Sequence, residues 1–187
     1  VRPQAPLIPK GVDWIKAYAE SVDPDQQTVT LSDGRLVGYD YLVVSPGIQL
    51  DFHAVAGMEE AMTTPHVSSN YVLDSTAKTW ANLQQTKKGT ALFTMPAGPI
   101  KCAGAPQKIA YLSADYWRQQ GNLKDMRVVL VLPTPGMFGV KVFADELERV
   151  VARYGIEVHK NSELVEIDGV GRTAVIRDNT DQSTTTL

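Results

Sequence analysis

The feature that most constrains this chain is an alternation of helix-like and strand-like segments between residues 74 and 160. Short apolar runs are predicted as strands, and segments with helical spacing precede or separate them: strands at 90–95, 127–132 and 156–160, helices at 74–87, 106–121 and 140–154. Such an order implies right-handed crossovers and a parallel sheet. We therefore expect an α/β fold, a Rossmann-like parallel sheet with flanking helices.

Each predicted helix has one apolar face, expected to be buried. The residues on these faces are Trp80 and Leu83, then Ile109, Leu112 and Tyr116, then Phe143, Leu147, Val150, Val151 and Tyr154. Gly89 is expected to cap the first helix, and Pro106 to begin the second. A further strand is predicted at 173–178, while 179–186 is too rich in Ser and Thr to assign.

The amino-terminal part has the pattern of a small antiparallel meander. Residues 14–19 and 28–31 alternate apolar and polar side chains, and Asp33-Gly34 predicts a tight turn. Residues 41–44 form a continuous apolar run expected to be a strand buried on both faces. We expect three regions: a partial domain at 1–52, a connection at 53–66 and a Rossmann-like second domain at 67–187.

Composition excludes several classes of protein. With 43% hydrophobic residues the 187-residue chain is globular, and a net charge of -3 leaves no basic surplus for nucleic acid. One cysteine builds no disulfide framework, and its spacing from the three histidines predicts no metal site. No apolar run approaches the ~20 residues of a membrane helix. Residues 1–10 contain neither an initiator methionine nor a signal-peptide core, so an internal fragment is expected.

In a parallel sheet, ligands gather where strands end and helices begin. The loop at 133–139 contains Gly136 and Gly139 but lacks the GxGxxG order, and prolines remove backbone donors. We expect a rigid turn there, with two glycines for close packing. The loop at 96–106 also lacks this order, but it places Cys102 just before a helix.

Three effects favour the thiolate form of Cys102: unpaired helix N–H groups, the helix dipole, and the nearby cations Lys101 and Lys108. A lone cysteine is equally compatible with a small buried core residue, so placement leaves both interpretations open. Two interpretations also stand for Pro46 and Gly47, which either bring bare backbone close to a cofactor or make a sharp exit from a strand.

The run KCAGAPQK at 101–108 resembles the cysteine motif of sulfide:quinone oxidoreductases, in the branch that includes the mitochondrial enzymes. Further matches keep order and spacing along the chain: LIPKGVDWIK at 7–16, YDYLVVSPGIQLDF at 39–52, SNY at 69–71, KTW at 78–80 and FGVKVFAD at 138–145.

This resemblance implies a two-Rossmann-domain flavoprotein that passes electrons from sulfide through a cysteine pair and FAD to quinone. Residues 1–52 would then be part of the FAD-binding domain, and 67–187 would be the second, NAD(P)-type domain that carries the redox cysteine. Cys102 would be a redox cysteine beside the flavin, Lys108 an active-site lysine, and Pro46 and Gly47 part of a turn against FAD. It also implies peripheral association of the whole protein with a bacterial or mitochondrial inner membrane. The oligomeric state is not predicted.

The family's amino-terminal GxGxxG motif, second cysteine and carboxyl-terminal quinone segment do not occur within these 187 residues. The chain by itself is therefore expected neither to retain FAD nor to turn over. Two alternatives remain open: another flavin or NAD(P)H oxidoreductase, such as an NADH:quinone reductase, and a non-catalytic Rossmann-like domain with a structural cysteine.

Overall fold

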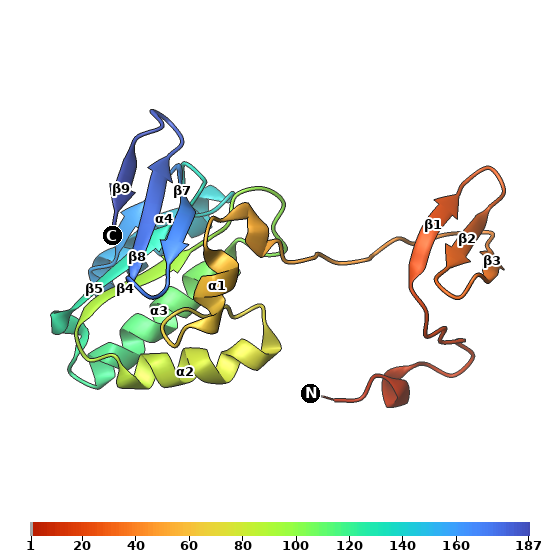
Figure 1. Cartoon of the computed structure of the whole chain (residues 1–187), viewed down its shortest axis with the longest axis horizontal. Helices are drawn as coiled ribbons and strands as arrows, with labels where there is room; N and C mark the ends of the chain where they lie inside the picture. Colours follow the sequence, from red (N-terminus) through yellow and green to blue (C-terminus); the bar gives the residue numbers. More distant parts are fainter. Residues whose placement is uncertain (1) are drawn as a thin grey trace. The chain divides into compact units, whose positions relative to one another are not determined.

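The computed structural model describes residues 2–187, which form two compact units, one ending at Pro46 and the other spanning Gly47–Leu187. The first unit contains a 3-10 turn, η1 (Ala5–Leu7), and an antiparallel sheet in the order β1 (Ala19–Asp23), β2 (Thr28–Leu31), β3 (Leu36–Gly38) (Figure 1). The predicted meander is thus confirmed.

The first strand of the meander lies later than predicted, at Ala19–Asp23 instead of 14–19. Asp23 Oδ1 accepts hydrogen bonds of 3.0 Å from the backbone N–H groups of Asp25 and Gln26. This turn sets the pairing of β1 with β2, because an aspartate that bonds the backbone two residues ahead reverses the chain locally. The alternating apolar and polar residues at 14–19 favoured a strand there, and the turn at Asp23 was not recognised.

The strand predicted at 41–44 is wrong. No residue of this run belongs to a strand, and Tyr41 and Val43 are 95% and 88% exposed. Within residues 2–187 no neighbouring strand pairs with this run. An apolar run forms a buried strand only when partners satisfy its backbone and cover its faces.

The second unit combines a parallel and an antiparallel sheet. Its elements in chain order are η2 (Phe52–Ala54), α1 (Met58–Thr63), η3 (Leu73–Ser75), α2 (Thr76–Gln85), β4 (Gly89–Thr94), α3 (Gly104–Gln119), η4 (Leu123–Asp125), β5 (Met126–Val131), α4 (Lys141–Tyr154), β6 (Glu157–His159), β7 (Ser162–Asp168), β8 (Thr173–Asp178) and β9 (Thr184–Thr186). The parallel sheet has the order β4-β5-β6, as expected of the predicted crossovers. The predicted fold class is confirmed, while β7 and β9 were missed.

Strand β5 forms the centre of the unit and is covered on both faces (Figure 1). Val128 and Leu130 pack with side chains of α2, α3 and α4, whereas Val129 and Val131 pack with β7 and β8 and with Met58 of α1. The flanking helices α2 to α4 therefore share one face, and the antiparallel β7-β8-β9 sheet covers the other.

The predicted buried stripe of α3 is wrong by about one position. Buried residues are Gln107, Ala110, Ser113, Ala114 and Trp117, whereas Leu112 is 57% exposed. Small side chains let a helix approach the sheet closely, so the largest apolar residues do not mark the inner face. Phe143 of α4 and Trp80 of α2 are likewise exposed.

Two helix ends differ from those predicted from the sequence. Helix α3 begins at Gly104, two residues before Pro106, because proline is tolerated throughout a helix's first turn, where N–H groups lack partners. Helix α2 ends at Gln85, and the Thr86 hydroxyl donates a 2.7 Å bond to the Asn82 carbonyl. Gly89 begins β4 with φ +100° and caps no helix.

Helix α1 lies within the region predicted as a connection. Ala56 just before it exchanges backbone hydrogen bonds with β7, accepting from the Ile167 N–H at 2.9 Å and donating to the Val165 carbonyl at 3.0 Å. Residues 56–63 thus belong to the second unit. The functional domains expected at 1–52 and 67–187 stay a prediction.

Candidate functional site

Cys102 follows the carboxyl end of β4 and directly precedes α3. Its thiol is free and exposed. The Cys102 carbonyl accepts a 3.2 Å hydrogen bond from the Ala105 N–H, and a Cβ placed on Gly104 would lie 3.9 Å from the Cys102 sulfur. The sulfur therefore lies over the first turn of α3, open to solvent. An exposed thiol contributes nothing to the apolar core, which removes the main argument for a buried structural cysteine.

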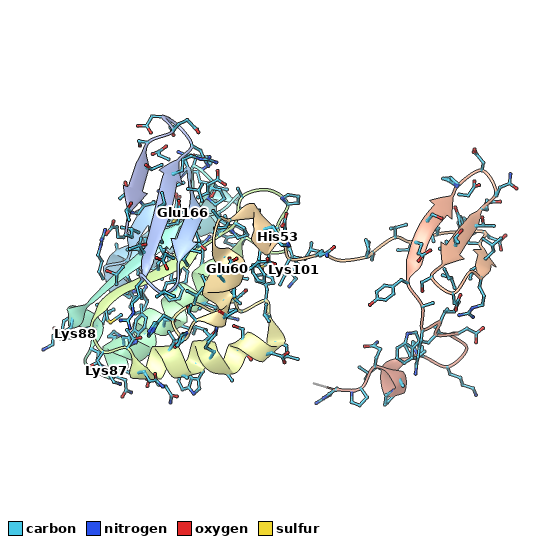
Figure 2. All side chains as sticks on the ribbon, in the orientation of Figure 1. His53, Glu60, Lys87, Lys88, Lys101 and Glu166 are labelled. Carbon is cyan, nitrogen blue, oxygen red and sulfur yellow. The ribbon has the colours of Figure 1, made fainter. Side chains whose placement is uncertain are left out.

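Two lysines flank this thiol in sequence. Lys101 lies in the loop between β4 and α3 (Figure 2), and Lys108 lies in the second turn of α3. Both side chains are exposed, and neither forms an ion pair with any residue in the range 2–187. The loop and helix start that carry Cys102 therefore also carry two cations without a carboxylate partner among the described residues.

Gln107 supports the same turn from the inside. Its side chain is 1% exposed, and its Nε2 donates to the Met137 carbonyl at 2.6 Å and to the Ala103 carbonyl at 3.3 Å. Its Oε1 accepts a 2.7 Å hydrogen bond from the Tyr111 hydroxyl. Burial, and secondarily the negative charge of Glu148, raises the pKa of Tyr111 to about 12, so this hydroxyl stays a donor at neutral pH.

A largely apolar groove of about 560 Å³ opens beside this turn, between α3, α4 and the loop after β5. Its lining residues are Gly104, Gln107, Lys108, Tyr111, Leu112, Phe138, Phe143, Glu146 and Leu147. Phe138 and Phe143 meet edge to face with ring centroids 6.2 Å apart. The groove lies where both helices begin, the region in which parallel sheets bind ligands.

The loop at 133–139 is a turn, but its glycines do not serve close packing. A Cβ on Gly136 would come no nearer than 4.0 Å to another atom, and one on Gly139 would meet nothing. The loop is held instead by the buried side chain of Met137 and by Thr134, whose hydroxyl donates a 2.8 Å hydrogen bond to the Gly136 carbonyl.

Pro46 and Gly47 stand at the boundary of the two units, and both are exposed. Gly47 has φ +78°, and a Cβ placed on it would meet no atom within 4 Å. The structure thus brings Cys102, Lys101 and Lys108 together on one segment, while Pro46 and Gly47 lie on another.

The roles of Gln107 and Tyr111 in supporting the turn, and of Phe138 and Phe143 in lining the groove, were not predicted from the sequence. One signal was present: Gln107 falls on the spacing of Ala110, Ala114 and Trp117, where a polar side chain must be buried and hydrogen-bonded. No local signal indicated that Met137 would supply its partner.

No family model matches the chain. The sulfide:quinone oxidoreductase of Mus musculus mitochondria is 38% identical over 167 residues, which are 89% of this chain and 37% of that protein. The mitochondrial sulfide:quinone oxidoreductase of Schizosaccharomyces pombe is 34% identical over 189 residues, covering 97% of this chain and 41% of that protein. A crystal structure of the Aquifex aeolicus sulfide:quinone oxidoreductase matches with a TM-score of 0.71 and 23% identity over 92% of this chain and 40% of that chain.

The parallel sheet covered by helices, together with this structural match, shows a Rossmann-like α/β fold. The chain spans about two fifths of the length of the curated relatives that it matches. By sequence it belongs to the sulfide:quinone oxidoreductase family, which confirms the resemblance carried by residues 101–108.

Residues 2–187 contain no helix that is both long and apolar enough to cross a bilayer. Nor do they bring three or more His, Cys, Asp or Glu side chains together in an arrangement that could hold a metal ion.

Proposed function

We propose that this chain supplies the redox cysteine of a sulfide:quinone oxidoreductase, a flavoprotein that oxidises sulfide and reduces quinone. The observation that carries the proposal is the exposed, unpaired thiol of Cys102 at the start of α3, within a motif shared with that family. Its chemistry follows from this placement.

Cys102 would act as the sulfur carrier. A thiolate is the form that attacks or exchanges with a disulfide, and the exposed sulfur at the start of α3 is open to such a partner. In the proposed reaction, hydrosulfide attacks the sulfur of an oxidised cysteine pair. One S–S bond breaks, one cysteine leaves as a thiolate, and the other retains the incoming sulfur as a persulfide.

Lys108 would hold anions close to this sulfur. Its ammonium group has no ion-pair partner within 2–187 and lies on the same helix, so its charge remains available to hydrosulfide and to the leaving thiolate. A cation in the early turns of a helix opposes the helix dipole. Stability therefore does not explain its position, whereas anion attraction does.

Pro46 and Gly47 would lie against the cofactor. FAD, when bound, supplies the chemistry of accepting an electron pair from the sulfur centre and delivering it to quinone. A glycine with φ +78° and open space at its Cβ position suits the flat face of such a ring, since no side chain intervenes. The exposed thiol of Cys102 is likewise open to an electron acceptor.

The mitochondrial relatives and the quinone substrate favour a peripheral site on an energy-conserving membrane for the whole protein. The quinone substrate points there because quinones with isoprenoid tails reside in the lipid phase. Nothing in the charge of -3 favours nucleic acid as a partner.

The test is sulfide-dependent quinone reduction by the full-length gene product that carries these residues, compared with its Cys102→Ser variant. We expect Cys102→Ser to lower kcat by roughly 100-fold or more, as loss of a nucleophile does. Lys108→Gln should lower kcat/KM for sulfide by about tenfold, because one electrostatic contact is lost.

The matched control is Lys87→Gln. Lys87 precedes the amino end of β4 (Figure 2), whereas Cys102 follows its carboxyl end, so this lysine lies at the opposite edge of the sheet. Its replacement should leave kcat/KM unchanged. Full sulfide oxidation by Cys102→Ser, or quinone reduction driven by NADH in place of sulfide, would overturn the proposed function.

A further inference from the structure

Gln107 is a polar residue at a position that packing alone would fill with an apolar one. It shares the inner face of α3 with Ala110, Ala114 and Trp117, all 1% exposed or less. Burying an amide costs free energy unless every polar group finds a partner. A buried, fully bonded amide instead specifies one arrangement of the groups that it joins.

The side chain of Gln107 uses both of its amide N–H donors and one lone pair of its amide oxygen. Its Nε2 donates to the carbonyls of Met137, at 2.6 Å, and Ala103, at 3.3 Å, and its Oε1 accepts from Tyr111 at 2.7 Å. Two acceptors on one side and a donor on the other fix the orientation of the amide.

These partners join the two loops at the carboxyl end of the parallel sheet. Ala103 is the residue after Cys102 and the N-cap of α3, and Met137 lies in the loop that follows β5. Strands β4 and β5 pair in register from Gly89 to Thr94. A bond between their outgoing loops therefore holds the Cys102 turn against the rigid sheet.

We propose that Gln107 is a positioning residue for the Cys102 thiol, acting through the Ala103 carbonyl; the proposal rests on the function assigned above to Cys102. The 96–101 segment before the cysteine contains no helix or strand. The turn is therefore anchored by the Ala105 N–H bond to the Cys102 carbonyl and by Gln107 behind it. Without the Gln107 hydrogen bonds, we expect the bond between the Ala105 N–H and the Cys102 carbonyl to break more often.

The first experiment measures hydrogen exchange of the Ala105 amide in the full chain, normalised to the Val129 amide in the central strand. Gln107→Met keeps the length and packing of the side chain but removes all three hydrogen bonds. We expect it to speed Ala105 exchange roughly tenfold relative to Val129, because only local opening is favoured. Tyr111→Phe, which frees one side of the amide, should give a smaller increase.

Ser113→Ala is the matched control. Ser113 is buried in the same helix, and its hydroxyl donates a 2.7 Å bond to the Ile109 carbonyl, which is remote from the cysteine turn. It should leave the normalised exchange of Ala105 unchanged. An unchanged rate in Gln107→Met, or an equal increase in Ser113→Ala, would overturn the positioning role.

The second experiment measures sulfide-dependent quinone reduction by the full-length gene product. Gln107→Met should lower kcat by about tenfold or more through misplacement of the thiol, with KM for quinone unchanged. A rise in KM for quinone without loss of kcat would contradict the proposal. If Cys102→Ser retains activity, the function assigned to Cys102 fails, while the exchange result still decides whether Gln107 holds the turn.

Discussion

The indole Nε1 of Trp117 donates a 3.0 Å hydrogen bond to the backbone carbonyl of Leu83, which ties α3 to α2. Trp117 is 1% exposed, and its ring lies 6.5 Å from that of Phe93 on β4. The residue thus joins both helices to the parallel sheet on the face that supports the Cys102 turn.

We expect Trp117→Ala to lower the free energy of unfolding of the second unit by about 3–5 kcal/mol, since it leaves a large cavity. Urea denaturation followed by far-UV circular dichroism measures this. Trp80→Ala is the control, because Trp80 is 49% exposed and meets Tyr116 edge to face. Equal losses in both variants would show that the buried position of Trp117 is wrong.

Gly57 should tolerate no side chain. It has φ +75°, and a Cβ built on it would lie 2.2 Å from the carbonyl oxygen of Ile167 in β7. Gly57→Ala must therefore separate α1 from β7, and we expect it to cost roughly 3 kcal/mol or more, combining backbone strain with overpacking.

The control for that variant is Gly155→Ala at the end of α4. Gly155 has φ +65° but open space around its Cβ position, so only the left-handed backbone is penalised, by about 1 kcal/mol. Thermal unfolding of both variants separates the two effects. A Gly57→Ala protein as stable as Gly155→Ala would contradict the contact between α1 and β7.

The pair Arg127–Glu157 links β5 to β6 and should make stability depend on acid pH. Hydrogen bonds from Arg127, followed by that of His159, lower the pKa of Glu157 from 4.5 to about 2. A lowered pKa means that the stabilisation is present above pH 4.5 and is lost as the pH falls toward about 2. Both side chains are partly exposed, so solvent limits the effect to about 0.5–1 kcal/mol.

Urea midpoints of the wild-type protein and Glu157→Gln should therefore differ at neutral pH and converge as the pH falls through that window. The exposed i,i+3 pair Glu146–Arg149 on α4 provides the comparison. Glu146→Gln should change stability by no more than ~0.5 kcal/mol at any pH. A constant difference between wild type and Glu157→Gln down to low pH would be inconsistent with the pair.

The sequence predicted the parallel sheet because its strands and helices carry strong local signals, such as the apolar run of β5 and the glycine that ends α4. It failed where nonlocal packing decides. The run at 41–44 has the composition of a buried strand but no partner within 2–187, and β7 alternates too weakly to stand out.

In the candidate site, too, the features with local sequence signals were predicted and those that depend on nonlocal contacts were not. Cys102 was found from its place before Pro106 and from its motif, both of which are local. The network of Gln107 was missed because its main partner, the Met137 carbonyl, lies 30 residues away and is backbone, which no side-chain pattern reveals.

The most direct test of the account is to find where sulfur resides during turnover. The full-length gene product would be mixed with sulfide, quenched with an alkylating reagent and digested with trypsin, which releases residues 102–108 as one peptide because lysines precede and end it. We predict that this peptide carries the mass of one or more additional sulfur atoms, dependent on sulfide. Turnover at the normal rate with residues 102–108 bearing only the unmodified Cys102 thiol would contradict the central claim.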